Sequence, residues 1–409
     1  MKTHTQLSPE TIKIVKSTAP ILQSQGEIIT KHFYTRMFSK HPELLNVFNQ
    51  TNQKMGKQPS ALAHSVYRAA AHIDCLDQIL PEVELIAHKH RSLGVKPEQY
   101  AIVGENLLAA IEEVLGEAAT PEVLHAWKEA YQVIADVFIE VERQLYKEVE
   151  QQPGGWKDFK PFIVVKKVKE SDVITSFYLK PKDGGMLPHF KPGQYISVKV
   201  EIPGEPYIHH RQYSLSDRPG QDYFRISVKR EDGTDTKPAG VVSTFLHQKV
   251  NEGDILEISP PAGNFILDQS SDRPVVLISG GVGLTPLLSM LKTALNTSDR
   301  PVTFIHAAIN GRTHAFREEV LALKKQHPQL NTYFCYERPT EEDRALNRFD
   351  KEGYIDIDWF ESIIPQRDAQ FYFCGPVPFM KEVLRILRAM GIQEEQINYE
   401  FFGPKGKLD

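Results

Sequence analysis

Residues 275–286, which read VVLISGGVGLTP, decide the fold of the last third of the chain. The stretch opens with an apolar run, 275–278, of the kind that forms a strand buried on both faces of a parallel sheet. A glycine turn at 280–283 follows, and a helical pattern begins directly after it. Small residues let a backbone approach phosphate groups closely, and the N–H groups of a helix N-terminus favour negative charge. Taken alone, such a turn is weak evidence for a nucleotide site.

The alternation of strand and helix continues toward the C-terminus. Further strand patterns lie at 302–308, 332–336 and 370–374, and a helical pattern starts near Phe316. This alternation indicates an α/β doubly wound domain with a parallel sheet. We assign the domain to residues 269–409.

Upstream of this domain the chain consists of short β-rich runs separated by Gly and Pro. The runs expected to form strands are 161–168, 173–179, 194–200, 211–215, 224–229 and 254–259. Such a series predicts a small antiparallel β-barrel, which we place at 157–268. Residues 151–156, QQPGGW, have the composition of a linker.

Residues 1–150 show helical patterns and no convincing strand. Ser8-Pro9-Glu10 combines a capping serine, a proline at the first helical position and an acid in the first turn, which together mark a helix start. Prolines interrupt or restart the pattern at 41–43, 80–82, 96–98 and 120–122. The longest helix is expected at about 121–148. The predicted fold is therefore multidomain, with an all-α part, a β-barrel and an α/β part in that order.

His90 is the histidine that points into the core of the helical part. Val83 and Ala87 mark the inward face of its helix, and His90 takes the next inward place. On this fact alone a hydrogen-bonded core histidine is favoured over a metal ligand. Tyr100 and Glu142 also lie on apolar helical stripes, and a buried carboxylate is costly unless it is paired. A group of His, Tyr and Glu would orient a metal-bound imidazole and raise its electron donation.

The run Arg211-Gln212-Tyr213-Ser214 lies on the fourth expected strand. Arg211 offers a fork of donors suited to a phosphate, Tyr213 on the same strand face can stack on a flat ring, and Ser214 can hydrogen-bond a ring nitrogen. An ordinary amphipathic strand explains the run equally well. A tyrosine one strand earlier, Tyr195, and a helix start at 240–243 suited to pyrophosphate favour a flavin site.

A second motif, Cys374-Gly375-Pro376, follows another apolar strand. An alternative interpretation of Cys374 is a small residue buried at the end of that strand. The order R-x-Y-S, G-x-G-x-x-P, C-G-P resembles the ferredoxin–NADP reductase superfamily. This resemblance implies FAD bound by Tyr195, Arg211, Gln212, Tyr213, Ser214, Gly240, Val241, Val242 and Ser243. It implies NADH or NADPH bound by Gly281, Val282, Gly283, Leu284, Thr285, Pro286, Cys374, Gly375 and Pro376.

The C-terminal tail matches the superfamily's final segment, in which an acid and an aromatic residue lie over the flavin. The residues expected there are Glu400, Phe401, Phe402, Gly403 and Pro404. Phe401 stands where some relatives carry a cysteine, and a last apolar sheet edge would also account for the tail. The stretch 231–239 is longer than in some relatives, which leaves its contacts open. Arg312 could reach a ribose phosphate or be a solvated loop charge, so NADH and NADPH are not distinguished.

Residues 1–150 resemble the globin domain of bacterial and yeast flavohaemoglobins. The segments that carry the resemblance are HFYTRMF (32–38), HPELLNVFNQTNQ (41–53), IAHKHRSLGVKPEQY (86–100) and WKEAYQVIADVFIEVE (127–142). The resemblance implies haem b with His90 as the proximal ligand and Tyr100 and Glu142 as its partners. Phe48 and Lys89 are expected in the haem pocket. The distal residues are expected to be Tyr34, Gln58 and Leu62, each of which would pass for an ordinary core or solvated residue by itself.

The resemblance covers essentially the whole chain and implies a nitric oxide dioxygenase. NADH or NADPH would reduce FAD, FAD would reduce the haem iron, and haem-bound oxygen would convert nitric oxide to nitrate. One alternative is an oxygen or nitric oxide sensor whose reductase resets the haem, which predicts slow turnover with every acceptor. Another is a flavin reductase or lipid-peroxide reductase, which predicts fast reduction of a different acceptor.

The overall composition limits the partners and the compartment. A formal net charge of −5 and the lack of a long basic run argue against a nucleic-acid partner. The polar N-terminus offers no signal peptide, and no run is long enough to span a bilayer. Cys75, Cys335 and Cys374 form neither a metal-binding spacing nor a disulfide framework. We expect a cytoplasmic monomer that takes oxygen and nitric oxide as substrates, with lipid a further candidate for the distal pocket.

Overall fold

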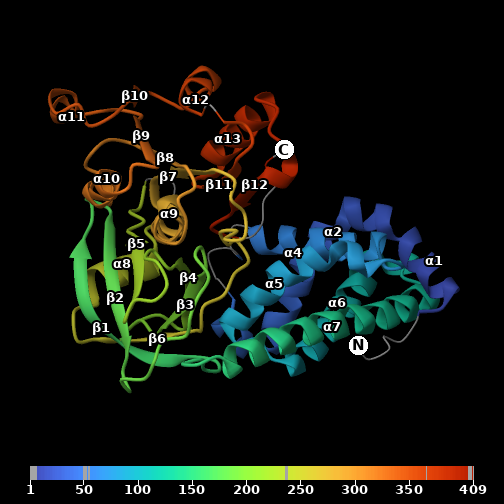
Figure 1. Cartoon of the computed structure of the whole chain (residues 1–409). Helices are drawn as coiled ribbons and strands as arrows, with labels where there is room; N and C mark the ends of the chain where they lie inside the picture. The colour runs from blue at the N-terminus through green and yellow to red at the C-terminus, as the bar shows by residue number, and fades with distance from the viewer. Residues whose placement is uncertain are drawn as a thin grey trace. The chain divides into compact units, whose positions relative to one another are not determined.

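The computed structural model describes residues 7–48, 53, 56–234, 238–364, 366–403 and 408. The chain forms two compact units, one mainly helical and the other containing most of both sheets (Figure 1). The helical unit combines the first 159 residues with 199–211, and the second unit is built from 160–198 and 212–402. Within the described residues, no helix has both the length and the apolar character needed to cross a membrane.

The described part of residues 1–150 is helical, as predicted. Its α-helices are α1 (Pro9–Ser17), α2 (Ala19–Lys40), α4 (Lys57–Ala71), α5 (Leu80–Leu93), α6 (Pro97–Leu115) and α7 (Pro121–Gln151), and its 3-10 turns are η1 (Pro42–Asn46), η2 (Leu76–Ile79) and η3 (Gly116–Ala118). The side chain of Ser8 caps α1 by accepting a hydrogen bond from the Thr11 N–H at 3.0 Å. The long helix α7 ends at Gln151 instead of near 148, and so enters the stretch expected as a linker.

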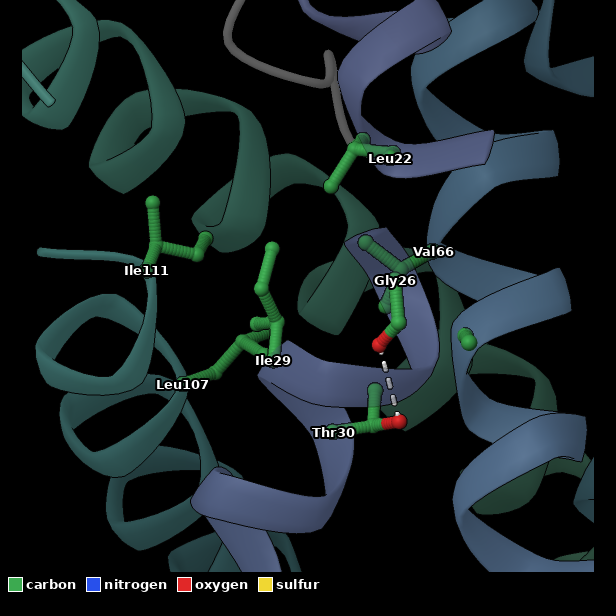
Figure 2. A pocket seen from close by; sticks show the side chains of 8 residues that line it. Leu22, Gly26, Ile29, Thr30, Val66, Leu107 and Ile111 are labelled. Carbon is green, nitrogen blue, oxygen red and sulfur yellow. Dashed lines mark hydrogen bonds between the residues drawn. The ribbon is translucent and has the colours of Figure 1, made fainter. Parts of the chain in front are cut away.

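The core of this unit lies between α2, α4, α6 and α7. Phe33 and Met37 on α2, Ile111 on α6 and Trp127 on α7 are almost completely buried in it. A small apolar pocket opens between α2, α4 and α6 (Figure 2). Its lining residues are Leu22, Gly26, Ile29, Thr30, Ala63, Val66, Leu107 and Ile111.

The six expected β-runs form one sheet of six strands. They are β1 (Lys160–Lys169), β2 (Ile174–Pro181), β3 (Tyr195–Val200), β4 (His209–Ser214), β5 (Phe224–Lys229) and β6 (Ile255–Ile258), in the order β4-β3-β6-β1-β2-β5. An antiparallel bridge between Leu215, which follows β4, and Ile226 in β5 joins the two ends of this order. The bridge closes the sheet into the predicted barrel. A helix, α8 (Val241–Lys249), follows β5.

The last third forms a second sheet of six strands, and all its pairings are parallel. The strands are β7 (Val275–Gly280), β8 (Val302–Ala308), β9 (Leu330–Tyr336), β10 (Lys351–Glu352), β11 (Gln370–Cys374) and β12 (Ile397–Glu400), in the order β10-β9-β8-β7-β11-β12. The helices are α9 (Leu284–Thr297), α10 (Arg317–Gln326), α11 (Glu341–Ala345), α12 (Ile357–Ile363) and α13 (Val377–Ala389), with the 3-10 turns η4 (Gly281–Gly283) and η5 (Glu394–Gln396).

Alternating side chains of β7 face two separate cores, which confirms the doubly wound arrangement. Val275 and Leu277 pack with α9 and α10, while Val276 and Ile278 pack with α12 and α13. The strand order reverses direction between β7 and β11. In open α/β sheets, ligands bind beyond the carboxyl ends of the strands at such a point.

Candidate functional site

The three polar residues predicted to act together in the helical unit are in contact. His90 lies on α5, Tyr100 on α6 and Glu142 on α7. The His90 Nδ1 atom lies 2.8 Å from Glu142 Oε1 and 3.0 Å from the Tyr100 hydroxyl. The Tyr100 hydroxyl in turn donates to Glu142 Oε1 at 2.5 Å. Three helices that are separate in sequence therefore bring one imidazole, one phenol and one carboxylate together.

This geometry leaves one ring nitrogen of His90 for a metal. Because the Glu142 carboxylate can only accept a hydrogen bond, His90 Nδ1 is the donor, and Nε2 is the ring nitrogen left for a metal. The Glu142 side chain is only 4% exposed, whereas that of His90 is 32% exposed, so the carboxylate is enclosed and the ring keeps an accessible edge. Burial, with the negative charge of Glu142, raises the pKa of Tyr100 and keeps its hydroxyl protonated. The donor set fits a haem iron bound at Nε2.

Tyr34 on α2 is buried among aromatic rings. Its ring stacks on Phe38 at 5.7 Å between centroids and meets Phe48 edge-on at the same distance. Burial raises the pKa of the Tyr34 hydroxyl, and the nearby side chains of Gln58 and Gln53 oppose that rise. Tyr34 is therefore a neutral hydrogen-bond donor surrounded mostly by apolar groups.

The other predicted haem-pocket residues lie on the expected elements. Leu62 is half-buried on α4, one turn after Gln58, and packs against the core that contains Tyr34. Lys89 precedes His90 on α5, and burial lowers the pKa of its ammonium group.

Gln53 was not predicted as a site residue. Gln53 ends the segment 41–53 that carries the globin resemblance. No helical spacing in that segment predicts that its side chain lies beside Tyr34. Its Nε2 atom is buried and has no hydrogen-bond partner among the described residues.

The run 211–214, which is expected to bind the flavin, lies at the end of β4, and Tyr195 lies at the start of β3. Gln212 donates through Nε2 to Ser197 Oγ at 3.2 Å, and the side chain of Ser214 is buried. Tyr195 pairs with Ala262 through two backbone hydrogen bonds of 2.9 and 2.8 Å. Its ring lies against Gly263, where a Cβ atom would come within 2.9 Å of it. Gly263, which the sequence did not single out, leaves room for this ring.

Arg211 directly precedes Gln212 on β4 and bonds through Nη1 to the His210 carbonyl oxygen at 2.8 Å. A helix, α8, begins where the pyrophosphate site is expected. Gly240 is the N-cap of α8, and Ser243 Oγ donates to its carbonyl oxygen at 3.1 Å. Val242 is buried, whereas Val241 is 41% exposed at the helix start. The N–H groups at such a helix N-terminus favour an anionic ligand.

The two glycine motifs expected to bind the dinucleotide meet at the carboxyl ends of β7 and β11. A Cβ atom on Gly283 would lie 2.2 Å from the carbonyl oxygen of Cys374, and one on Gly375 would lie 3.2 Å from the Gly280 Cα. Glycine is therefore required at Gly283 for the turn to contact the backbone of the second motif. Thr285 Oγ1 caps the turn by donating to the Val282 carbonyl oxygen at 3.0 Å. Leu284 and Pro286 are buried in the first turn of α9, and Pro376 is exposed before α13.

Glu400 on β12 lies beside Cys374 in the parallel register of β11 and β12. Burial raises the pKa of its carboxyl to about 8, and its Oε2 atom has no partner among the described residues. Burial, with the nearby Glu400, also raises the pKa of the Cys374 thiol, so this sulfur is not a thiolate at neutral pH. Phe402 is 50% exposed.

The remaining tail residues can be placed only in part. Phe401 packs against the second core of the α/β part, and Gly403 adopts a positive φ. Pro404 lies outside the described residues, as do 235–237 of the long stretch 231–239.

Family models match the three parts of the chain in order. A globin model matches residues 31–138, an oxidoreductase FAD-binding domain matches 161–266, and an oxidoreductase NAD-binding domain matches 277–385. Among solved structures, the flavohemoglobin of Malassezia yamatoensis with bound FAD and heme superposes with a TM-score of 0.82 at 28% identity, over 97% of this chain and 100% of that one. The FAD/NAD-binding domain of the Vibrio cholerae nitric oxide dioxygenase superposes with a TM-score of 0.55 at 38% identity, over 61% of this chain and 100% of that one.

Curated relatives match along nearly the full length. The flavohemoprotein of Halalkalibacterium halodurans is 59% identical over 403 residues, which are 98% of each chain. The flavohemoprotein of Bacillus subtilis is 53% identical over 403 residues, which are 98% of this chain and 99% of that one. With this identity over the whole length, and a globin joined to FAD- and NAD-binding oxidoreductase domains, the chain belongs to the flavohemoprotein family.

Proposed function

We propose that this chain is an NAD(P)H-dependent nitric oxide dioxygenase that converts nitric oxide to nitrate with oxygen. The observation that carries the proposal is the group of His90, Tyr100 and Glu142, joined in one chain to a reductase whose dinucleotide motifs meet at Gly283 and Cys374. When bound, the reduced dinucleotide would supply a hydride, FAD hydride acceptance and single-electron transfer, and haem oxygen activation.

The assigned roles follow from the contacts of each residue. Glu142 and Tyr100 hold Nδ1 of the His90 ring and so orient the ring with Nε2 free to face a metal. Tyr34 offers its O–H to a substrate on the distal side, with Gln58 and Leu62 beside it and Phe48 against its ring. The apolar surroundings exclude water there, which strengthens that hydrogen bond. Lys89 is assigned to the proximal edge of the pocket.

The reductase residues are assigned on the same basis. Tyr195, Arg211, Gln212, Tyr213 and Ser214 would hold the flavin end of FAD, and the start of α8 at 240–243 its pyrophosphate. The tail residues 400–404 would cover the flavin. The two motifs at 281–286 and 374–376 would bind the dinucleotide. NADH and NADPH are both candidates for it. We propose domain boundaries of 1–150, 157–268 and 269–409, with 151–156 as the linker.

We further propose that the protein acts as a monomer in the cytoplasm. One chain carries the haem site and its reductase, so electron delivery needs no second copy. The three cysteines are free, which suits a reducing compartment. Lipid in the distal pocket remains a prediction, and mass spectrometry of solvent extracts from the purified protein tests it.

The direct experiment is nitric oxide consumption by the purified protein in air with NADH or NADPH. We expect haem and flavin absorption bands, rapid loss of nitric oxide and stoichiometric nitrate. Consumption no faster than in protein-free buffer would overturn the proposal. The variant His90→Ala should lose haem while still allowing dinucleotide-driven reduction of the flavin, and a normal haem content would refute that ligand assignment.

A further inference from the structure

Four charged side chains meet inside the second unit, where the barrel packs against the α/β part. Asp217 follows β4 and Arg225 lies on β5, while Lys292 lies on α9 and Glu319 on α10. Asp217 Oδ1 lies 2.5 Å from Lys292 Nζ, and Glu319 Oε1 lies 2.8 Å from the same nitrogen. Arg225 Nη1 lies 3.1 Å from Glu319 Oε2 and 3.7 Å from Asp217 Oδ2. We call these four residues the ion-pair interlock.

Three of the four side chains of the interlock are largely enclosed. The side chains of Arg225 and Asp217 are 3% and 6% exposed, and that of Lys292 is 17% exposed. Although burial alone would raise it, the charges of Arg225 and Lys292 hold the pKa of Asp217 below its ordinary value. Two positive and two negative charges balance, so removal of one would leave an uncompensated buried charge.

Other contacts of the same residues also hold this junction. Ser289 on α9 donates through Oγ to the Asp217 carbonyl oxygen at 2.7 Å. The Arg225 guanidinium lies 4.7 Å from the centroid of the Phe316 ring, directly before α10, and donates to the Ser216 carbonyl oxygen at 2.5 Å. Hydrogen bonds from the barrel and from the α/β part thus converge on Asp217 and Arg225.

The position of the interlock relative to the two cofactor motifs gives it functional meaning. Asp217 comes shortly after Ser214, the last residue of the flavin motif on β4. Lys292 lies on α9, which begins directly after Gly283 of the dinucleotide turn. The Asp217–Lys292 ion pair therefore connects the segment directly after the strand with the expected flavin motif to the helix directly after the glycine turn.

We propose that the ion-pair interlock positions the dinucleotide-binding turn against the flavin-binding strand and so sets the geometry of hydride transfer. The inference rests on the proposed function only for the identity of the donor and acceptor. Hydride transfer depends on close approach and alignment of two rings, and a misplacement of about 1 Å can cost about 100-fold in rate. Lys292, Asp217, Arg225 and Glu319 are positioning residues in this scheme, because none of them is placed against a reacting atom.

The test measures flavin reduction by NADH in the full-length holoprotein by anaerobic stopped-flow absorbance. Lys292→Met should lower the limiting rate constant at saturating NADH about tenfold. FAD and haem content should be unchanged, and the primary isotope effect with deuterated NADH should rise. Hydrogen exchange should become faster in 215–225 and 284–297. Lys292→Arg, which keeps the charge, should restore the rate, and Lys324→Met on the exposed face of α10 should behave as the parent.

Several results would overturn the inference. One is an unchanged limiting rate constant in Lys292→Met together with faster hydrogen exchange, because the ion pair would then serve stability alone. Another is a slow Lys292→Arg variant with native exchange rates. If Lys292→Met does not fold, Glu319→Gln provides the same measurement at the more exposed member of the interlock. Flavin reduction by NADH is measured without oxygen or nitric oxide. Its result therefore does not depend on whether the protein passes the nitric oxide dioxygenase assay.

Discussion

The Nδ1 atom of His90 lies 2.8 Å from Oε1 of Glu142, although the two residues are 52 positions apart in the chain. The contact joins α5 to α7 and holds the imidazole by a charged acceptor that is almost fully enclosed. Hydrogen bonds from His90 and Tyr100 stabilise the buried carboxylate of Glu142. Without these two donors, the buried charge would destabilise the folded chain.

Replacement Glu142→Gln should weaken electron donation by His90, because a neutral amide replaces the carboxylate behind Nδ1. We expect nitric oxide turnover to fall by roughly 10- to 100-fold, the usual cost of losing such a partner. The iron–histidine stretching band in resonance Raman spectra should move to lower frequency. Glu140→Gln, at an exposed position on the same helix, is the matched control. An unmoved band in Glu142→Gln would show that this carboxylate does not affect electron donation by His90.

Replacement Tyr34→Phe keeps the buried ring but removes its hydroxyl. The distal ligand then loses a donor in an apolar pocket, and oxygen should dissociate about tenfold faster, which corresponds to a hydrogen bond of ~1.4 kcal/mol. Flash photolysis or stopped-flow mixing measures the rate. Tyr67→Phe, at a half-buried position on α4, should leave it unchanged. Equal dissociation rates in Tyr34→Phe and the parent would remove Tyr34 from the mechanism.

Replacement Gly283→Ala should disrupt dinucleotide binding with little effect on haem and FAD. The added Cβ would lie 2.2 Å from the Cys374 carbonyl oxygen, so the turn must move away from the second motif. We expect the apparent affinity for NADH to fall at least tenfold in titrations of flavin reduction, which is the range of an overpacked site at ~1–3 kcal/mol. Gly185→Ala is the control, since its nearest neighbours are flexible side-chain atoms. Native NADH affinity in Gly283→Ala would show that the close approach is not required.

Glu400 gives a pH dependence whose sign follows from burial. The pKa of its carboxyl is about 8 in the folded chain and 4.5 in the unfolded chain. Between pH 4.5 and pH 8 the carboxyl is therefore protonated in the folded state and ionised in the unfolded state. Its contribution to the free energy of unfolding therefore falls as pH rises toward 8, by at most ~1.4 kcal/mol per pH unit, and is constant above 8.

Urea unfolding between pH 6 and 9 measures this slope as the difference between the parent and Glu400→Gln. The amide does not titrate, so the difference should change with pH up to about 8 and then level off. Glu394→Gln, at an exposed position before β12, should track the parent at every pH. A difference that is independent of pH would show that Glu400 is ionised throughout this range.

The element types were predictable from the chain because their signals are local. Ser8 and Thr120 cap their helices as their sequence context indicates, and the apolar run at 275–278 forms the central strand of the parallel sheet. The inward place of His90 also follows from helical spacing. The helix α7 runs past 148 because the chain has no glycine or proline between 122 and 152, and Pro153 is the first residue that cannot continue it.

Other features depend on packing between distant segments, and no local pattern reveals them. Gln53 lies beside Tyr34, and Gly263 leaves room for the Tyr195 ring, only because separate elements are brought together. Arg225 and Asp217 read as ordinary polar positions around a strand, yet the structure buries both.

The sequence by itself determined the order of the three parts, the strands and helices within them and the motifs that could hold cofactors, since periodicity and capping act over a few residues. The tertiary structure alone decided which charges meet. Glu142 faces His90, and Lys292 faces Asp217, because helix packing and sheet topology set these distances. A buried charge is tolerated only where the completed fold supplies its partner.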